Sequence, residues 1–549
     1  MDNYYDLGSY SRTISTTSED AQRWFTRGLL WCFGYNHDES IACFQRALEA
    51  DPNCAIAHWG VAYAAGCNYN KPWEAFDSDD ASRSLALAYD ATQAALSLAD
   101  TASPVEAALI RALPARYPSR TPAEDMCPWN DDFAEAMRAA YLAHPKDAEI
   151  ATIFAEAMMN RTPWALWDLK SGQPAEGADT LEIMDVLERA LGGCNGMQHP
   201  GLLHLYIHAL EMSPTPEKAL KAADALRGLV PDAGHLQHMP THIDVLCGHY
   251  ERVVSSNEDA IIADRKFLES EGPINFYSLY RCHNYHFKIY GAMFLGQFQP
   301  AIDTAEEMIA SLPDELLQVQ SPPMADWLEG FISMKQHIYI RFGKWQEIID
   351  QELPKDRTLF CVSTAMMLYA KAVAYAASGD AINGEKFAGL FDEAVKNVPD
   401  TRYIFNNTCL DILAVAREMM LGEVEYRKAN YDAAFAHLRK SVELDDNLPY
   451  DEPWGWMQPT RHALGALLHE QGHVEESSAV YRADLGLDKT LSRACQHPDN
   501  VWSLMGYHDC LLQLGRTEEA IIIGQRLALA KARTDIAVKS SCFCKLGSF

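Results

Sequence analysis

The chain has no long hydrophobic run and almost no strand-like alternation. No segment holds the eighteen or so consecutive apolar residues that a helical membrane span requires. The N-terminal stretch MDNYYDLGSYSRTISTTSED is polar and acidic, and no basic segment followed by an apolar run precedes it. We therefore expect no signal peptide, no membrane partner and a cytoplasmic location.

Positive charge is also scarce. The 549 residues contain 46 Lys and Arg against 76 Asp and Glu, which gives a formal net charge of −30. Such a surface repels the phosphates of nucleic acids and of anionic membranes at long range. The composition therefore excludes nucleic acid as an expected partner.

Several sequence motifs of common enzymes are missing. The chain has no G-x-S-x-G elbow, no phosphate-binding glycine loop and no dinucleotide fingerprint after a strand, which excludes serine hydrolases, nucleotide triphosphatases and Rossmann oxidoreductases. Its fourteen cysteines lack the dense spacing of a secreted disulfide scaffold, so we expect most to be reduced and buried. Cys542 and Cys544 differ, because an extended C-x-C places both sulfurs on one side.

What the chain does have is a helical repeat. The segment WFTRGLLWCFGYNHDESIACFQRALEADPN has the small and large residues of a tetratricopeptide unit at the expected offsets: Trp24, Gly28, Trp31, Phe44, Ala47 and Pro52. In the next segment, Gly60 and Tyr63 repeat the step from Gly28 to Trp31. Weaker units with a glycine and an aromatic residue at the turn follow. The pattern predicts an all-α, tetratricopeptide-like α-solenoid of antiparallel helix pairs.

Irregular stretches interrupt the repeats and are expected to form loop insertions that cover one face. They are residues 99–130, with five prolines, residues 231–242, and residues 448–465. We expect one continuous solenoid with four regions. These are N-terminal repeats (1–98), a helical insertion (99–198), histidine-rich central repeats (199–300), and C-terminal repeats with the Cys-x-Cys tail (301–549).

Histidines are concentrated in the central region. Nine of the nineteen lie within the 88 residues from His199 to His286, where an even distribution would place about three. His204 and His208 are four residues apart in a helical run, so both imidazoles project from one face. His238 and His242 have the same spacing, although Pro240 between them favours a loop or a first helical turn.

This pattern predicts an open metal site that binds a divalent transition metal, since neutral imidazole binds zinc, copper and iron. The spacing does not select among these metals. The predicted ligands are His204, His208, His235, His238, His242 and His283. In the alternative interpretation, each histidine lies at a helix seam and donates to a backbone carbonyl.

Other side chains are candidates for the chemistry. Glu211 and Glu156 are candidates for a general base or for a partner that orients an imidazole, and each is also read as an ordinary helix residue. Arg461 has the geometry to bind a substrate carboxylate or to form a buried ion pair. The predicted substrate pocket consists of His37, Trp59, Asn68, Trp164, Trp167 and Trp502, with packing in the core as the alternative for the tryptophans. Cys542 and Cys544 are candidate ligands for a soft metal, or a redox-active tail.

Five segments resemble a widespread bacterial and fungal family of tetratricopeptide-domain proteins. They are GYNHDESIACFQRALEADPNCAIAHWGVAYAAGCNYN, FAEAMMNRTPWALWD, HPGLLHLYIHALEMSPTPEKALKAADALRGLVPDAGHLQHMPTHI, CHNYHF and SSCFC. The resemblance implies the repeat fold and a role for the histidine block, and it implies no reaction. The matching positions are Asn36, His37, Trp59, Asn68, Asn70, Trp164, Trp167, His199, His204, His208, Glu211, His235, His238, His242, His283, Asn284, His286, Cys542 and Cys544. Cys282 departs from it, because proline is expected there.

Two functions remain. In the first, the solenoid encloses a histidine-rich metal site and is an enzyme of small-molecule metabolism or biosynthesis, with hydrolytic or oxygen-dependent chemistry. In the second, it is a non-catalytic scaffold that binds an extended peptide or a partner protein in a groove. Regularly spaced Lys, Arg and Asn on inner helices are not evident, and a scaffold has little use for clustered histidines. The sequence therefore favours the enzyme and leaves a protein partner and the oligomeric state open.

Overall fold

The computed structural model describes residues 4–545, and the regular secondary structure of this part is almost all helix. Its strands are β1 (Tyr403–Ile404) and β2 (Asn407–Thr408), which pair antiparallel with Tyr403 opposite Thr408. The predicted all-α fold class is therefore confirmed. Among the helices of the described residues, none is both long enough and apolar enough to cross a membrane.

Contacts divide the chain into two compact units. Unit 1 comprises residues 1–243 and 259–272, and unit 2 comprises residues 244–258 and 273–549. Helices α12 (Thr241–Leu246) and α13 (Tyr250–Glu271) each contribute residues to both units. This division does not test the boundaries of the four regions expected from the sequence, which stay a prediction.

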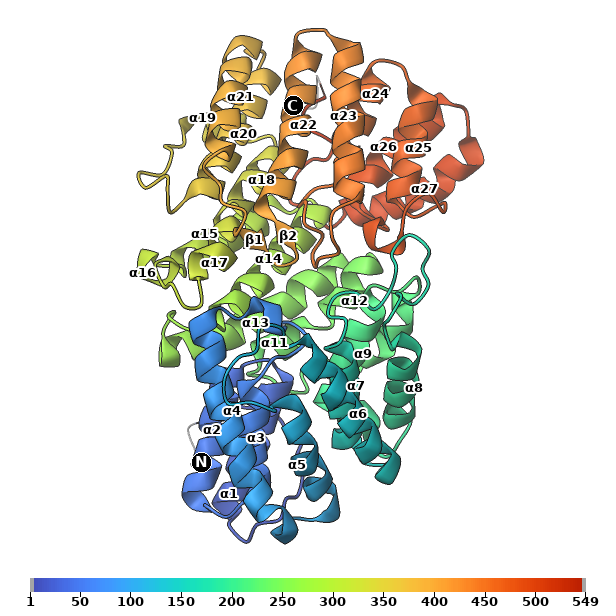
Figure 1. The fold of residues 1–549 in the computed structure, drawn as a ribbon. Coiled ribbons are helices and arrows are strands. Elements are labelled where there is room, and N and C mark those ends of the chain that lie inside the picture. Colours follow the sequence, from blue (N-terminus) through green and yellow to red (C-terminus); the bar gives the residue numbers. More distant parts are fainter. Residues whose placement is uncertain (1–3, 546–549) are drawn as a thin grey trace. The chain divides into compact units, whose positions relative to one another are not determined.

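Unit 1 is built from consecutive helices that pack against their neighbours in the chain, as Figure 1 shows for α1, α2 and α3. Its helices besides α12 and α13 are α1 (Glu19–Phe33), α2 (His37–Ala50), α3 (Ala55–Ala65), α4 (Ser78–Leu98), α5 (Pro104–Arg116), α6 (Cys127–Ala143), α7 (Ala148–Met159), α8 (Thr180–Leu191), α9 (Pro200–Glu211), α10 (Leu220–Leu226) and α11 (Gly234–His238).

The first helices of unit 1 show the packing that the repeat pattern predicts. The Phe44 ring of α2 lies against Gly28 of α1 and Gly60 of α3. A β-carbon at Gly28 would lie 2.7 Å from this ring, and one at Gly60 would lie 2.6 Å from it. Since β-carbons do not approach other atoms so closely, glycine at both positions is what lets the three helices close around one aromatic side chain.

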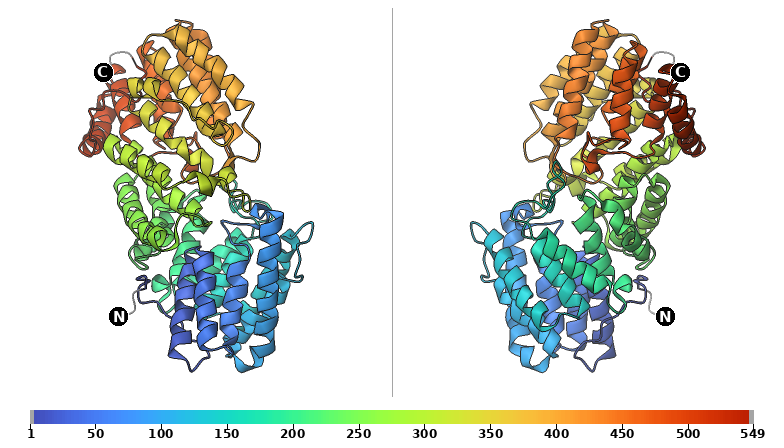
Figure 2. Two further views of the ribbon diagram at one scale, coloured as in Figure 1. Left: turned by 90° about the vertical axis from the view of Figure 1, so that its left-hand side faces the viewer. Right: turned by 90° about the vertical axis from the view of Figure 1, so that its right-hand side faces the viewer.

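Unit 2 is likewise built from consecutive helices that pack against each other. Figure 2 shows this for α22 and α23, drawn in orange, which run along each other. Its helices are α14 (Ser278–Leu295), α15 (Phe298–Ala310), α16 (Asp314–Leu317), α17 (Met324–Ile332), α18 (Met334–Arg341), α19 (Trp345–Asp350), α20 (Cys361–Ala377), α21 (Ala381–Val395), α22 (Cys409–Arg427), α23 (Tyr431–Asp446), α24 (Arg461–Glu470), α25 (Val474–Asp484), α26 (Val501–Gln513) and α27 (Thr517–Lys531).

The predicted break around the histidine loop is present in the structure. Pro240 lies between α11, which ends at His238, and α12, which begins at Thr241. Both helices are very short, since proline removes a backbone donor and disfavours helix in the residue before it. This local break brings the histidines of residues 235–242 into the core of unit 1, where they are fully buried.

Candidate metal centre

Helix α9 is fully buried and carries two of the predicted ligands on one face. It begins with His199 as N-cap, whose Nδ1 accepts the Leu202 N–H at 3.1 Å, and with Pro200 at its first position. His204 and His208 follow one helical turn apart, and their ring centroids are 4.7 Å apart. Both side chains are at most 1% exposed. The predicted spacing thus places two imidazoles side by side away from water.

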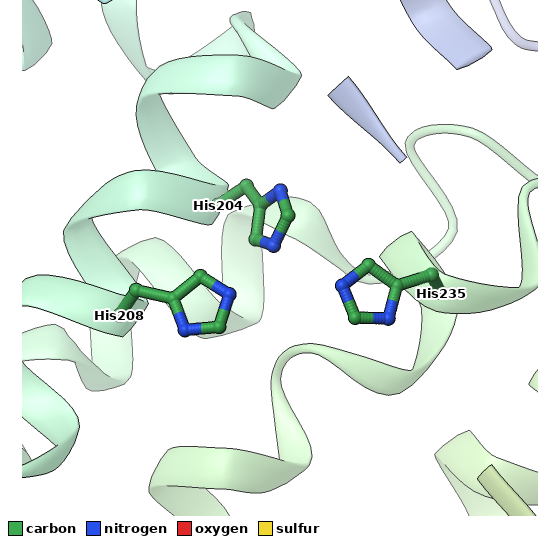
Figure 3. A group of neighbouring side chains, drawn as sticks. All are labelled: His204, His208 and His235. Atoms are coloured by element: carbon green, nitrogen blue, oxygen red, sulfur yellow. The ribbon is translucent and has the colours of Figure 1, made fainter. Parts of the chain in front are cut away.

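His235 on α11 completes a group of three imidazoles. Figure 3 shows the rings of His204 and His208 projecting from α9 toward the His235 ring, which enters from a separate helix. One ring nitrogen from each of the three lies within 4.8 Å of the others. Two elements that are far apart in the chain therefore present three nitrogens to one point.

Hydrogen bonds fix the orientation of both α9 imidazoles. Nδ1 of His204 lies 2.7 Å from the carbonyl oxygen of Phe33, at the end of α1. Nδ1 of His208 lies 2.9 Å from Oε1 of Glu211. Because both oxygens accept, each Nδ1 carries the proton and each Nε2 keeps its lone pair. These two buried Nε2 atoms accept no hydrogen bond from any residue between 4 and 545. An N–H held by an acceptor, with the other nitrogen presented for coordination, is typical of histidine metal ligands.

Glu211 links this group to the histidines of the loop. Its second oxygen, Oε2, lies 2.6 Å from Nδ1 of His242, so one carboxylate orients two imidazoles. Nε2 of His242 lies 2.7 Å from Nε2 of His238. Two ring nitrogens at this distance need a proton or a cation between them. Unit 1 thus brings together five of the six predicted ligands, and Glu211 contacts two of them.

Burial keeps these imidazoles neutral. It lowers the pKa of His204 to about 3, although the Phe33 carbonyl acts in the opposite direction. Burial also lowers the pKa values of His208 and His235 well below the ordinary value, and the neighbouring imidazoles add to this effect. The neutral ring is the form that coordinates a metal, so the environment favours the ligand state at physiological pH.

Aromatic rings surround the group. The Tyr35 ring lies 4.6 Å from that of His204 and 5.5 Å from that of His235, and the Tyr69 ring lies 5.1 Å from that of His208. Trp164, which the sequence predicts in the pocket, lies 5.6 Å from the His208 ring. Tyr35 and Tyr69 are not among the residues that the sequence predicts for this pocket. Their signal is positional only, since Tyr35 directly precedes the motif residues Asn36 and His37, and Tyr69 lies between Asn68 and Asn70.

Two predicted pocket residues meet close to these rings. Nδ2 of Asn68 lies 3.4 Å from Nδ1 of His37, and Oδ1 of Asn68 accepts the backbone N–H groups of Asn70 and Lys71. The His37 ring lies 6.1 Å from that of Tyr35. Burial lowers the pKa of His37 to about 3, so this ring is neutral as well.

The other predicted residues of unit 1 have different surroundings. The Trp59 ring stacks on Tyr63 at 5.1 Å, and Nε1 of Trp167 donates to the Ala209 carbonyl oxygen at 2.7 Å. Glu156 accepts a hydrogen bond from the Tyr63 hydroxyl, and burial raises its pKa. Glu156 does not belong to the group of nitrogens described above, and its predicted catalytic role stays a prediction.

Three predicted site residues belong to unit 2 and are described there. Arg461 forms the ion pair that the sequence left as its alternative role, since Nη2 donates to Oδ2 of Asp446 at 2.6 Å and Nη1 donates to Oδ1. The His283 ring packs on that of Phe405 at 4.7 Å. Nε1 of Trp502 donates to the Met293 carbonyl oxygen at 2.7 Å, which is a core position.

The C-terminal cysteines are bonded to each other. A disulfide joins Cys542 to Cys544, and both pack on a buried apolar cluster of unit 2 that includes Leu464 and Leu467. The Ser541 carbonyl oxygen accepts from Nη1 of Arg341 at 2.9 Å. In this structure the two sulfurs are therefore engaged with one another in a docked tail, and the prediction that they bind a soft metal applies only to a reduced form.

Comparison with known proteins supports the repeat fold. The model of the tetratricopeptide repeat matches residues 36–54, which lie in α2 and the following turn. Among solved structures, the chain is similar to a human IFIT1 dimer with PPP-AAAA, with 14% identity, 77% of this chain and 72% of that chain covered, and a TM-score of 0.28.

Two further solved structures show the same level of similarity. Yeast Tom70 has 12% identity, with 92% of this chain and 99% of that chain covered and a TM-score of 0.26. The P58(IPK) TPR domain has 15% identity, with 84% and 99% covered and a TM-score of 0.20. At such values none of these proteins bears on function. No curated protein matches the chain.

Proposed function

We propose that this protein is a metal-dependent enzyme that acts on a small organic molecule at a histidine centre in unit 1. The observation that supports the proposal is the convergence of His204, His208 and His235, whose nitrogens lie within 4.8 Å of one another in a buried setting. Satisfied seam histidines would turn their nitrogens to separate backbone oxygens. Here the Nε2 atoms of His204 and His208 have no partner among residues 4–545.

The ligand set is consistent with zinc, copper or iron. Three imidazoles fill part of a tetrahedral or octahedral shell, so positions remain for water or substrate. A metal ion held in this way lowers the pKa of bound water or binds dioxygen, which corresponds to the two reaction classes expected from the sequence. Tyr35, Tyr69 and Trp164 supply apolar walls beside such an ion.

Glu211 is assigned a positioning role in this proposal. Both of its oxygens accept from imidazole Nδ1 atoms, at 2.9 Å from His208 and 2.6 Å from His242. A carboxylate in this position fixes the tautomer and the orientation of the two rings, and it raises the basicity of their other nitrogens. It therefore acts through the histidines, which is the second of the two roles that the sequence suggests for it, beside that of a general base.

Metal analysis of the purified, untagged protein tests the proposal. We expect about one equivalent of a transition metal in the wild type, and its loss in His204→Ala and His208→Ala, because two or fewer imidazoles hold an ion weakly. Glu211→Gln should retain the site with about 10- to 100-fold lower affinity, as expected for a partner that orients ligands. His58→Ala is the matched control, since its Nε2 lies 3.2 Å from the Pro52 carbonyl oxygen and away from the centre.

The opposite result would favour the second candidate. The repeat match at residues 36–54 is the observation in its favour, because arrays of such repeats commonly bind extended peptides. If the wild type, grown in metal-supplemented medium and prepared without chelators, binds no transition metal with higher affinity than His204→Ala does, the enzyme proposal is wrong and the scaffold remains.

A further inference from the structure

Arg116 is a fully buried charge in unit 1 with an incomplete set of partners. It is the last residue of α5 and is 1% exposed. Its Nη2 donates to the Cys67 carbonyl oxygen at 2.5 Å. Nε and Nη1 are also buried, and they donate to no residue between 4 and 545. The guanidinium lies over the Tyr63 ring at 4.5 Å and over the Phe133 ring at 4.8 Å.

This arrangement is costly unless an anion completes it. A guanidinium keeps its charge in proteins, and burying it is unfavourable unless its donors are paired. Stacking on aromatic rings recovers only part of the lost hydration. Among the described residues, no carboxylate lies within ion-pair distance of Arg116, and its closest hydrogen bonds go to the main-chain oxygen and the sulfur of Cys67. Its side chain also interacts with the Tyr117 hydroxyl, and the buried Glu156 carboxyl acts on it electrostatically.

Two further buried hydrogen-bond donors are linked to Arg116 through residues that contact it. Trp59 stacks on the Tyr63 ring that lies under Arg116, and its Nε1 has no partner among the described residues. Asn160 follows α7 directly, and neither Nδ2 nor Oδ1 of its side chain has a partner there. Its carbonyl oxygen accepts from Nδ2 of Asn130 at 3.0 Å, while the Cys67 thiol lies 3.6 Å from Oδ1 of Asn130. Asn160 is thus linked through Asn130 to the residue that holds Arg116.

Three consecutive residues connect this group to the metal centre. The Cys67 carbonyl oxygen accepts from Arg116, the Asn68 amide contacts His37, and the Tyr69 ring packs on His208. Segment 67–69 therefore contacts the guanidinium through Cys67 and the proposed ligand His208 through Tyr69. A molecule held by Arg116 would lie within a few side chains of the His208 imidazole.

We infer that Arg116, with Nε1 of Trp59 and the Asn160 amide, binds the carboxylate group of a small organic substrate. The inference rests on the proposed function in that it names the substrate class of that site. A carboxylate matches the planar fork of a guanidinium and accepts further hydrogen bonds from neutral N–H donors. The three unsatisfied donor groups would each gain a partner.

Glu156 belongs to the same neighbourhood and is compatible with this role. Its carboxyl group accepts from the Tyr63 hydroxyl, and burial raises its pKa. The Tyr63 hydroxyl and the charge of Arg116 act on this pKa in the opposite direction. Glu156 was predicted from sequence as a catalytic group, and its position beside a substrate carboxylate would place it within reach of the bound molecule.

Calorimetric titration of metal-free protein with benzoate as the probe tests the inference, with benzamide as its uncharged counterpart. We expect saturable binding of benzoate and much weaker binding of benzamide. Arg116→Gln should weaken benzoate binding by about 10- to 100-fold, the usual worth of a charge-assisted hydrogen bond. Arg120→Gln is the control, since Arg120 is an exposed arginine paired with Asp90.

A milder variant covers the case in which Arg116→Gln does not fold. Trp59→Phe keeps a ring on Tyr63 and removes one N–H donor, so benzoate binding should weaken by about 3- to 10-fold. The inference is wrong if benzoate does not bind to the wild type at concentrations up to about 50 mM. It is equally wrong if folded Arg116→Gln, or Trp59→Phe, binds benzoate as the wild type does.

The metal and carboxylate results are separable. His204→Ala should lose the metal and keep benzoate binding, because Arg116 does not depend on that imidazole for any recorded contact. Arg116→Gln should keep the metal. A wild type that binds benzoate through Arg116 but no metal would contradict the proposed function and leave the carboxylate site standing.

Discussion

At the residue scale, burial decides the protonation of nearly every side chain of interest. The imidazoles of His204, His208 and His235 are held neutral because their surroundings cannot solvate a positive charge. Arg116 keeps its charge, so the same burial leaves two of its nitrogens without a hydrogen-bond acceptor among the described residues. The low dielectric of the interior therefore matters for both candidate sites, because it favours neutral imidazoles at one and penalises unpaired guanidinium nitrogens at the other.

A buried acid in unit 2 gives a pH prediction. Burial raises the pKa of Asp445 from 3.8 to about 6, although Thr460 donates to it and Trp454 contacts the same carboxyl group. Because the folded pKa is the higher one, this group contributes stability that is fully present below about pH 4. That contribution is lost as the pH rises through about 6, with a total on the order of 3 kcal/mol.

Thermal unfolding of wild type and Asp445→Asn between pH 4 and pH 7 measures this effect. Asparagine also loses an acceptor for Thr460, which lowers the melting temperature by an amount that does not depend on pH. The wild type should therefore exceed the variant most at pH 4, and its advantage should shrink toward pH 7. A constant difference across this range would show that Asp445 does not titrate there.

At the element scale, short-range geometry sets where the site lies. The i, i+4 spacing on α9 places two imidazoles on one face, with their ring planes tilted by 44°. Pro240 separates α11 from α12, and His235 and His242 approach α9 from another direction. The repeat packing in α1 to α3 supplies the frame. The last carbonyl of α1, which has no partner within its own helix, accepts from His204.

Substitution of a glycine at the helix contacts tests the close packing of α1 to α3. In Gly60→Ala the new β-carbon would lie 2.6 Å from Phe44, so the ring or the helices must shift. We expect a loss of about 1 to 3 kcal/mol in the free energy of unfolding, as for other overpacked cores. Gly389→Ala on α21 is the control, because nothing lies within 4 Å of its β-carbon and alanine favours helix. Urea denaturation of both variants checks the prediction, and equal stabilities would contradict the packing argument.

At the scale of the whole molecule, the chain forms two compact units. The five clustered histidines, two of which contact Glu211, belong to unit 1, whereas the disulfide-linked tail and the Arg461 ion pair belong to unit 2. A ligand that binds only the folded state stabilises the part of the structure that holds it. Metal binding should therefore act on the two units unequally.

Hydrogen exchange with and without added zinc measures this difference. Protection should rise in α9 and α11, which carry the proposed ligands, and should stay unchanged in α20 and α21 of unit 2. With the metal at about 100 times its dissociation constant, the gain approaches 2.7 kcal/mol for amides that exchange by unfolding of unit 1. A uniform increase over both units, or none, would contradict this assignment.

The helical repeat class and the histidine cluster can both be predicted from the order of the amino acids. Both follow from local rules, namely the alternation of small and large residues at fixed offsets and the 3.6-residue period that aligns His204 with His208. It left open the role of Arg461, which the structure pairs with Asp446. It also gave no sign of Arg116, since an arginine at the end of a helix reads as an ordinary solvated residue.

Which side chains converge, and which buried nitrogens lack a hydrogen-bond partner, depends on the folded chain. His235 reaches His204 through a contact across 31 residues, and Phe33 reaches His204 across 171 residues. Burial and hydrogen-bond satisfaction depend on every neighbouring element at once, so no local pattern encodes them. For that reason the composition and spacing predict that the histidines matter, while the orientation of their nitrogens and the unmet donors of Arg116 follow from the folded chain alone.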